Sequence, residues 1–439
     1  MTGEEPPTRE AGSRRFVAGL VGISVFGLIL RVVYVLTVTR YDNSHFYDAF
    51  YYVGQAGDLA TGHGFQTPVV GGASALHPPL TALVEVPATW LFGIHGGTVP
   101  QRMTMAVLGA VAVGVIGWLG KVVAGHRVGI VAAVLAALYP NLWIPSGIVM
   151  SETLAILLTA LILIGTYRFL RSPGWVNATL LGVGCGLAAL TRSELSFFAL
   201  LILVPAVVVA RTLSGRARVA LAVLGIVVAG VVVSPWVVRN LVTFQKPTTL
   251  STGDGGLLLG ANCDATYHGA ELGYWSLGCS TAVTPSNDPS VLSARQDHAA
   301  FSYMRHHLSR LPVVVAARVG RIWDLYEPFQ TARFDQGEGR PVEASWAGIG
   351  AFYLLAPLAI AGFIVLGRQR KTRWPLVMPV VLVTLLAAGA YGIIRFRAPA
   401  EVSLVVLAAV ALDAGWRHWT SRRAPRSEPD PATLDPAVH

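Results

Sequence analysis

The chain has 439 residues, of which 53% are hydrophobic and only 13% are charged. Soluble domains carry about 25% charged residues, so this composition excludes an ordinary soluble protein. We interpret the formal net charge of +9 as Lys and Arg that flank membrane segments, and it does not indicate nucleic-acid binding.

Apolar segments of close to 20 residues recur along the chain, and each is long enough to cross about 30 Å of hydrocarbon as a helix. Helices are expected because backbone polar groups inside a bilayer need partners within the protein. We therefore predict an all-α polytopic membrane protein with ten transmembrane helices, at residues 17–37, 102–122, 128–147, 153–169, 176–191, 196–211, 218–237, 347–367, 375–394 and 398–416.

Lys and Arg lie between alternate predicted spans, and such residues favour the cytoplasmic side. They are Lys121, Arg127, Arg168, Arg171, Arg211, Arg216, Arg218, Arg368, Arg370, Lys371 and Arg373. In a plasma-membrane protein this pattern places residues 38–101 and 238–346 outside, around a membrane domain of residues 17–416. The tails 1–16 and 417–439 are then cytoplasmic. Both are polar and contain proline, so we expect residues 1–16 and those from about 420 onward to be disordered.

Residues 79–93 are apolar but short, and Glu85 and Pro87 interrupt them. If they spanned the membrane, every later basic loop would move to the outside. We therefore predict a helix lying in the outer interface, with a buried span as the alternative.

The first external segment carries a concentration of polar and aromatic residues. Asp48 is followed by Tyr51 and Tyr52, and later by the turn His77-Pro78-Pro79. A carboxylate, aromatic rings and a rigid turn just outside an apolar helix indicate chemistry on a substrate that is partly lipid and partly water-soluble.

Charged residues also occur in short outer turns, although a charge at the centre of a membrane helix costs about 2.5–3.5 kcal/mol. Glu152 opens a predicted helix after Tyr139, and it is either a favourable first-turn acid or a second carboxylate facing Asp48. Arg192 and Glu194 either pair with each other at the interface or face the same pocket.

Two arginines between apolar spans, Arg395 and Arg397, oppose the positive-inside trend. Arg395 and Arg397 join the last two spans, and Arg239 follows the seventh, next to Asn240. Guanidinium groups bind phosphate oxygens in pairs, so these residues fit either a lipid headgroup or a phosphate substrate. No cofactor is indicated with certainty; a divalent metal stays open, with Glu152 as its candidate ligand.

The chain has three cysteines. Cys185 lies within a predicted span, where it fits a small packing residue. Cys263 and Cys279 lie in the second external segment, where an oxidising exterior permits a disulfide. Spacing alone does not establish the required geometry, so bonded and free thiols both stay open.

The order of these motifs resembles the GT-C superfamily of polytopic glycosyltransferases, in particular the bacterial branch related to protein O-mannosyltransferases and the lipid A aminoarabinose transferase. The resemblance covers roughly residues 17–400. Two positions depart from the family pattern: Ala49 stands where a second acid is common, and His77 stands where Lys is common. The motifs that carry the resemblance are Arg31, the run from Asp48 to Phe65, His77 to Leu80, Tyr139-Pro140, Glu152, residues 190–192, residues 235–240 and residues 395–399.

The resemblance implies a GT-C-like fold with two external loops that carry interfacial helices. It also implies an external active site, a polyprenyl-phosphate sugar donor and Asp48 as the catalytic carboxylate. We assign donor phosphate binding to Arg239, Arg395, Arg397, His77 and Arg192. Acceptor binding, or a second acid, is assigned to Glu152 and Glu194, and the pocket lining to Tyr51, Tyr52, Tyr139 and Asn240.

The expected activity is transfer of a hexosyl or pentosyl group, with inversion, to a hydroxyl of a glycan, lipid or protein acceptor at the membrane. The alternative is a multi-span lipid or solute transporter. That alternative predicts ionisable residues at mid-membrane, whereas the charges here lie at the outer ends of spans, apart from Arg31.

Overall fold

The structure is a computed structural model that describes residues 9–40, 47–93, 98–210 and 212–423. In that part of the chain every regular element is a helix, and the single β-bridge joins Gln66 to Ala73. The predicted all-α class is therefore confirmed.

Within the described residues, six helices are long and apolar enough to cross a membrane. They are built on α1 (Arg9–Tyr34), α4 (Val99–Ala124), α7 (Glu152–Arg171), α10 (Gly215–Thr243), α17 (Val342–Arg368) and α19 (Ala398–Arg423). A seventh candidate is the bent pair α5 (His126–Leu138) and α6 (Pro140–Trp143), which η2 (Ile144–Gly147) continues. The remaining predicted spans are shorter apolar helices, so the number ten stays a prediction. These are α8 (Trp175–Thr191), the run of η3 (Ser193–Phe197), η4 (Ala199–Leu203) and α9 (Val204–Val209), and α18 (Trp374–Gly389).

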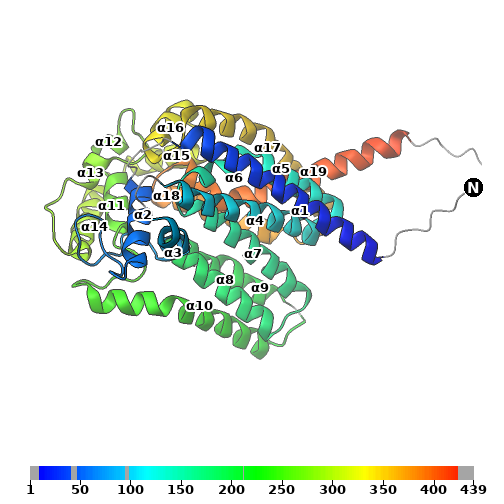
Figure 1. Ribbon diagram of the computed structural model, residues 1–439, viewed down its shortest axis with the longest axis horizontal. Helices are drawn as coiled ribbons and strands as arrows, with labels where there is room; N and C mark the ends of the chain where they lie inside the picture. Colours follow the sequence, from blue (N-terminus) through cyan, green and yellow to red (C-terminus); the bar gives the residue numbers. More distant parts are fainter. Residues whose placement is uncertain (1–8, 41–46, 94–97, 211, 424–439) are drawn as a thin grey trace, which may run out of the picture.

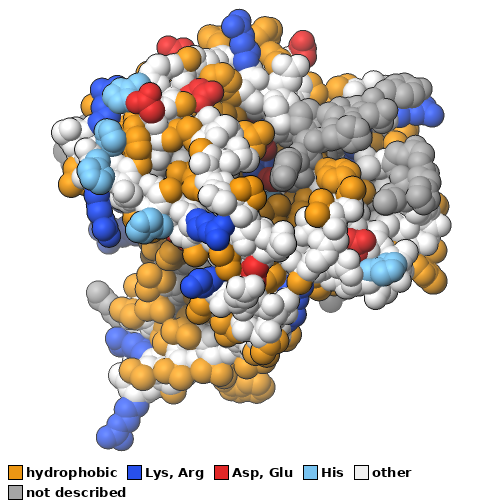
Figure 2. All heavy atoms as spheres, turned by 90° about the vertical axis from the view of Figure 1, so that its left-hand side faces the viewer, with side chains coloured by type: hydrophobic (Ala, Val, Ile, Leu, Met, Phe, Trp, Pro, Cys, Tyr) orange, Lys and Arg blue, Asp and Glu red, His pale blue; other side chains and the backbone are white. Residues whose placement is uncertain are grey.

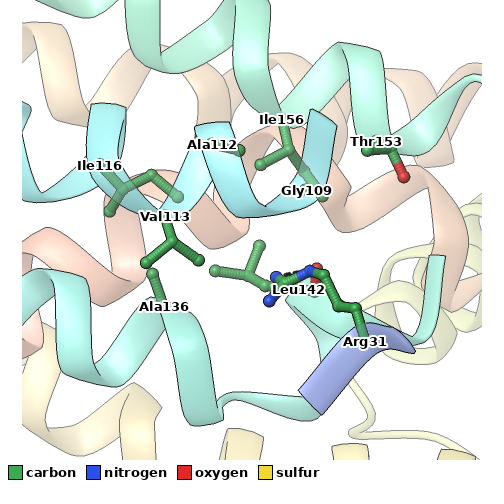
Figure 3. A pocket seen from close by; sticks show the side chains of 9 residues that line it. All are labelled: Arg31, Gly109, Ala112, Val113, Ile116, Ala136, Leu142, Thr153 and Ile156. Carbon is green, nitrogen blue, oxygen red and sulfur yellow. Dashed lines mark hydrogen bonds between the residues drawn. The ribbon is translucent and has the colours of Figure 1, made fainter. Parts of the chain in front are cut away.

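The predicted span at 128–147 is bent, because the chain turns by 74° between α5 and α6. Pro140 lacks an N–H and disfavours helical backbone in the preceding residue, and Tyr139 is indeed extended. Arg31 of α1 stabilises the bend by donating to the carbonyl of Leu142 at 3.0 Å and to Ser146 Oγ at 3.2 Å. Figure 3 shows Arg31 reaching Leu142 beside an apolar pocket that is too narrow for a water molecule.

The helices differ strongly in how deeply they are packed. In α19, 78% of the apolar window is buried inside the protein, whereas in α10 the share is 11%. Figure 1 shows α10 along one edge of the bundle and α19 passing through its interior, against α17 and α5. A helix with so much exposed apolar surface is suited to contact with lipid.

The first and last helices run past the predicted ends of their spans. α1 begins at Arg9 and α19 continues to Arg423. The disorder predicted for residues 1–16 and from about 420 onward is therefore wrong at 9–16 and 420–423, which are helical. Residues 1–8 and 424–439 lie outside the described residues.

The two segments predicted to be external lie together at one end of the bundle, opposite the N-terminus (Figure 1). Figure 2 faces this end, where acidic, basic and His side chains gather among hydrophobic ones. Cys263 and Cys279 are joined there in a disulfide, with Cα atoms 6.3 Å apart. The helices are α2 (Tyr47–Ala60), α3 (Leu80–Phe92), α11 (Asp254–Ala261), α12 (Asp264–Tyr267), α13 (Leu277–Ser280), α14 (Pro289–His306), α15 (Leu311–Ile322) and α16 (Pro328–Phe334).

Candidate functional site

Asp48 lies in the first turn of α2 and binds two cationic side chains from distant parts of the chain. Arg395, in the 3₁₀ turn η6 (Ile394–Arg397), donates from Nη2 to Asp48 Oδ2 at 2.6 Å. His77 Nε2 lies 3.1 Å from Asp48 Oδ1. Burial alone would raise the pKa of Asp48, but the charges of Arg395 and His77 and their hydrogen bonds lower it well below its usual range.

His77 is held in place by two tyrosines of α2. The ring of Tyr52 stacks on the imidazole with centroids 5.0 Å apart, and Tyr51 meets it edge-on at 5.2 Å. Tyr51 Oη also accepts the backbone N–H of Leu76 at 3.1 Å. Residues three and four apart share one helix face, so α2 presents Asp48, Tyr51 and Tyr52 together to the His77 turn.

A second group of charged residues adjoins this pair. Arg192, just after α8, donates to Glu152 Oε1 at 2.8 Å and to Glu194 Oε1 at 2.6 Å. Glu152 Oε1 also lies 3.9 Å from Arg395 Nε. These residues therefore pair at the helix ends, and Glu152 adjoins Asp48 through Arg395, while their role in a shared pocket stays a prediction.

Glu338, which the sequence analysis did not select, completes the group. It comes from η5 (Asp335–Glu338) in the segment 238–346 that we predict to be external, and its Oε2 lies 3.1 Å from Arg395 Nη1. Burial raises the pKa of Glu338, and the negative charges of Asp48 and Glu152 raise it further. The positive charge of Arg395 lowers the pKa, but the net result is a pKa above the ordinary value. A lone acid between Gly337 and Gly339 matches no motif, so only the packing reveals it.

We call these residues the Asp48 cluster: Asp48, His77, Glu152, Arg192, Glu194, Glu338 and Arg395. Among the described residues, four carboxylates here meet two guanidinium groups and one imidazole. Both arginines already pair with carboxylates. An incoming anion would therefore meet arginines whose charge is already partly compensated, although Arg395 Nε makes no hydrogen bond to any residue that the structure describes.

Arg397 lies outside the Asp48 cluster. It is fully buried and pairs with Asp324 Oδ2 and Glu401 Oε1, each at 2.6 Å. Tyr139 belongs to the same internal network, because its Oη donates to Glu401 at 2.9 Å. A 3₁₀ turn has three residues per turn, so side chains two positions apart point in different directions. The packing thus separates Arg397 from Arg395, which we had expected to act together.

Arg239 and Asn240 also lie apart from the Asp48 cluster. Arg239 of α10 donates to the carbonyls of Ser74 at 2.8 Å and Phe65 at 3.0 Å. Asn240, which is buried, donates to the carbonyl of Thr249 at 2.9 Å. Both side chains anchor loops to the end of α10, and the loop held by Arg239 leads directly to His77.

The described residues do not fit a metal centre. No group of three or more His, Cys, Asp and Glu side chains in this part of the chain is arranged to hold a metal ion. Glu152, the candidate ligand, instead faces Arg192 and Arg395.

No family model matches the chain, and no curated protein matches it. Among solved structures, the Archaeoglobus fulgidus oligosaccharyltransferase in complex with Zn and sulfate aligns with a TM-score of 0.54 at 15% identity, over 91% of this chain and 50% of that one. The same species' enzyme AglB, with an inhibitory peptide and a dolichol-phosphate, aligns with a TM-score of 0.52 at 13% identity, over 94% and 52%. ArnT from Cupriavidus metallidurans, bound to undecaprenyl phosphate, gives a lower TM-score of 0.40 at 15% identity, over 96% and 82%.

The chain spans about half the length of the archaeal enzyme. At such low identity the likeness concerns the fold alone, and at that level it confirms the resemblance drawn from the motifs. The chain shares its fold with the archaeal oligosaccharyltransferase, in agreement with the resemblance to the GT-C superfamily.

Proposed function

We propose that this protein is a membrane glycosyltransferase. It moves a sugar from a polyprenyl-phosphate-linked donor to an acceptor hydroxyl at the external face of the plasma membrane, with inversion. The observation that carries the proposal is the pairing of Asp48 with Arg395 across 347 residues, within a GT-C fold. A related archaeal structure holds a dolichol-phosphate together with an inhibitory peptide.

The reaction assigns opposite tasks to Asp48 and the arginines. The acceptor oxygen forms a bond to the anomeric carbon while the bond from that carbon to the phosphate oxygen breaks. The hydroxyl proton passes to Asp48 within the transition state, because a carboxylate is otherwise a weak base for an alcohol. The phosphate leaves as an anion, which Arg395 and Arg192 stabilise with preorganised charge.

In the resting arrangement Asp48 is a poor base, because Arg395 and His77 hold its pKa low. A donor phosphate that binds Arg395 draws that charge away from Asp48. The pKa of Asp48 then rises, so donor binding prepares the base for the acceptor.

The remaining residues have supporting tasks in this proposal. Glu152 and Glu194 hold Arg192, and Tyr52 holds His77. The polyprenyl tail lies beside α3, whose Trp90 and neighbouring side chains are strongly exposed and suited to lipid. The acceptor, whether glycan, lipid or protein, enters from the external side.

Lipid analysis of the purified protein tests the proposal. Native mass spectrometry of wild type in mild detergent should detect a polyprenyl phosphate or its sugar ester. Arg395→Lys keeps the charge but loses the planar fork, so its occupancy should fall. Arg305→Lys, at an exposed position of α14, is the control and should match wild type. Bulk phospholipid alone, equal in all three proteins, would oppose the proposal and favour a transporter.

A further inference from the structure

In the described part of the chain, three carboxylates contact Arg395, and they differ in whether each has a second cationic partner. Asp48 also binds His77, and Glu152 also binds Arg192. Glu338 pairs with Arg395 alone among the described residues, at 3.1 Å. Of the three, Glu338 can therefore leave Arg395 at the smallest cost in lost partners.

The backbone around Glu338 is anchored at both ends and carries a glycine on each side of this residue. Asp335 and Arg340 are buried, with Arg340 N–H donating to the carbonyl of Asp335 at 3.2 Å and its side chain donating to Asn141 at 3.0 Å. Between them, Gly337 has open space at its Cβ position and Gly339 has a φ of +81°. Glycine on both sides gives Glu338 backbone freedom that its anchored neighbours lack.

The charge balance favours an exchange of anions on Arg395. The Asp48 cluster already contains more carboxylates than guanidinium groups. A phosphate added to this set would be repelled by Asp48 and Glu338 at close range, where like charges oppose each other's ionised forms. The repulsion falls if one carboxylate withdraws as the phosphate arrives.

We propose that Glu338 occupies the place on Arg395 that the donor's phosphate takes, and that donor binding exchanges this carboxylate for the phosphate. The inference rests on the proposed function and deepens it. Glu338 then competes with the ligand for Arg395. Only an anionic headgroup can displace it, because a neutral lipid alcohol offers Arg395 no negative charge in place of the carboxylate.

Binding of farnesyl phosphate to the full-length protein in detergent tests the exchange. Glu338→Gln keeps the shape and removes the competing charge, so it should bind this probe about tenfold more tightly than wild type. That factor corresponds to a contact closed for about nine-tenths of the time at rest. Glu343→Gln makes the same change at an exposed position of the same region and should bind like wild type. Farnesol should not distinguish the three proteins.

Equal or weaker binding of farnesyl phosphate by Glu338→Gln would overturn the exchange. If that variant does not fold, Glu338→Asp replaces it, since the shorter carboxylate reaches Arg395 less well and predicts the same direction. The readout needs no turnover, so the two proposals fail separately. Tighter binding without sugar transfer keeps the exchange and removes the glycosyltransferase, whereas full transfer with unchanged binding removes the exchange alone.

Discussion

Arg395 and Arg397 are two residues apart on one turn, yet they bind different carboxylates. Arg395 pairs with Asp48 at 2.6 Å within the Asp48 cluster, whereas Arg397 pairs with Asp324 at the same distance in the protein interior. The buried ion pair of Arg397 with Asp324 holds the 3₁₀ turn η6 in place, and the position of this turn directs Arg395 toward Asp48. Substitutions at the two positions should therefore have different consequences.

Arg397→Gln should destabilise the protein strongly, because it leaves Asp324 and Glu401 buried without a cation. Breaking a buried ion pair in this way costs about 3–5 kcal/mol. Thermal unfolding in detergent measures the effect, with Arg333→Gln at an exposed position of α16 as the control. If both variants unfolded at the wild-type temperature, the internal pair would have no structural role.

Asp48→Asn should reduce sugar transfer at least 100-fold while binding of a polyprenyl phosphate persists. The amide keeps the size of the side chain but cannot accept the acceptor's proton, and general-base catalysis contributes about 10²–10⁴-fold. Single-turnover assays with parallel binding measurements separate the two effects. Asp58→Asn, on the same helix, is the matched control, and retained turnover in Asp48→Asn would remove Asp48 from the role of base.

The buried Asp335 should make stability depend on pH. The pKa of Asp335 is raised to about 7, mainly by burial. The positive charge of Arg340 lowers this pKa, and the negative charges of Glu338 and Asp324 raise it. Below pH about 4 the carboxyl is neutral in the folded and unfolded states alike. As pH rises from about 4 to about 7, the unfolded chain loses the proton first, so stability is lost until the folded group also ionises.

Asp335→Asn lacks this titration. Relative to wild type, its unfolding temperature should therefore rise between pH 4 and 7 and level off above that range. Asp264→Asn, at a carboxylate that is 90% exposed, should track wild type throughout. A constant difference between Asp335→Asn and wild type across the range would contradict the prediction.

Arg239→Met should loosen the loop that leads to His77, because two carbonyls lose their donor. Hydrogen exchange should accelerate at residues 61–76, and turnover should fall several-fold. Arg216→Met, at the opposite, exposed end of α10, should change neither quantity. A weaker donor affinity with unchanged exchange would instead support direct phosphate binding by Arg239, as the sequence suggested.

The sequence suffices for features that depend on local pattern and on helix ends. Hydropathy predicts the helices, and charges at outer turns select Asp48, His77, Glu152, Arg192 and Arg395, which do meet. They meet because each is fixed within a few residues of a helix end, and the bundle brings those ends together.

Features that depend on side-chain direction or on distant packing were not predictable in this way. The separation of Arg397 from Arg395 follows from the 3₁₀ turn, which leaves no hydropathy signal. Glu338 reaches Arg395 only because the ends of its segment are anchored elsewhere. The bend at Tyr139 differs from these features, because Pro140 disfavours helical backbone in the residue before it and so makes the bend predictable. The continuous apolar run nevertheless made residues 128–147 look like one helix.

The contact between Asp48 and Arg395 also has a consequence for when the cluster can form during synthesis of the chain. The two residues are 347 positions apart, and a ribosome adds about 5–20 residues per second. Asp48 therefore emerges roughly 20–70 s before its arginine exists. Through that interval the nascent chain cannot form this ion pair, so the Asp48 cluster is completed only after residue 395 has been added.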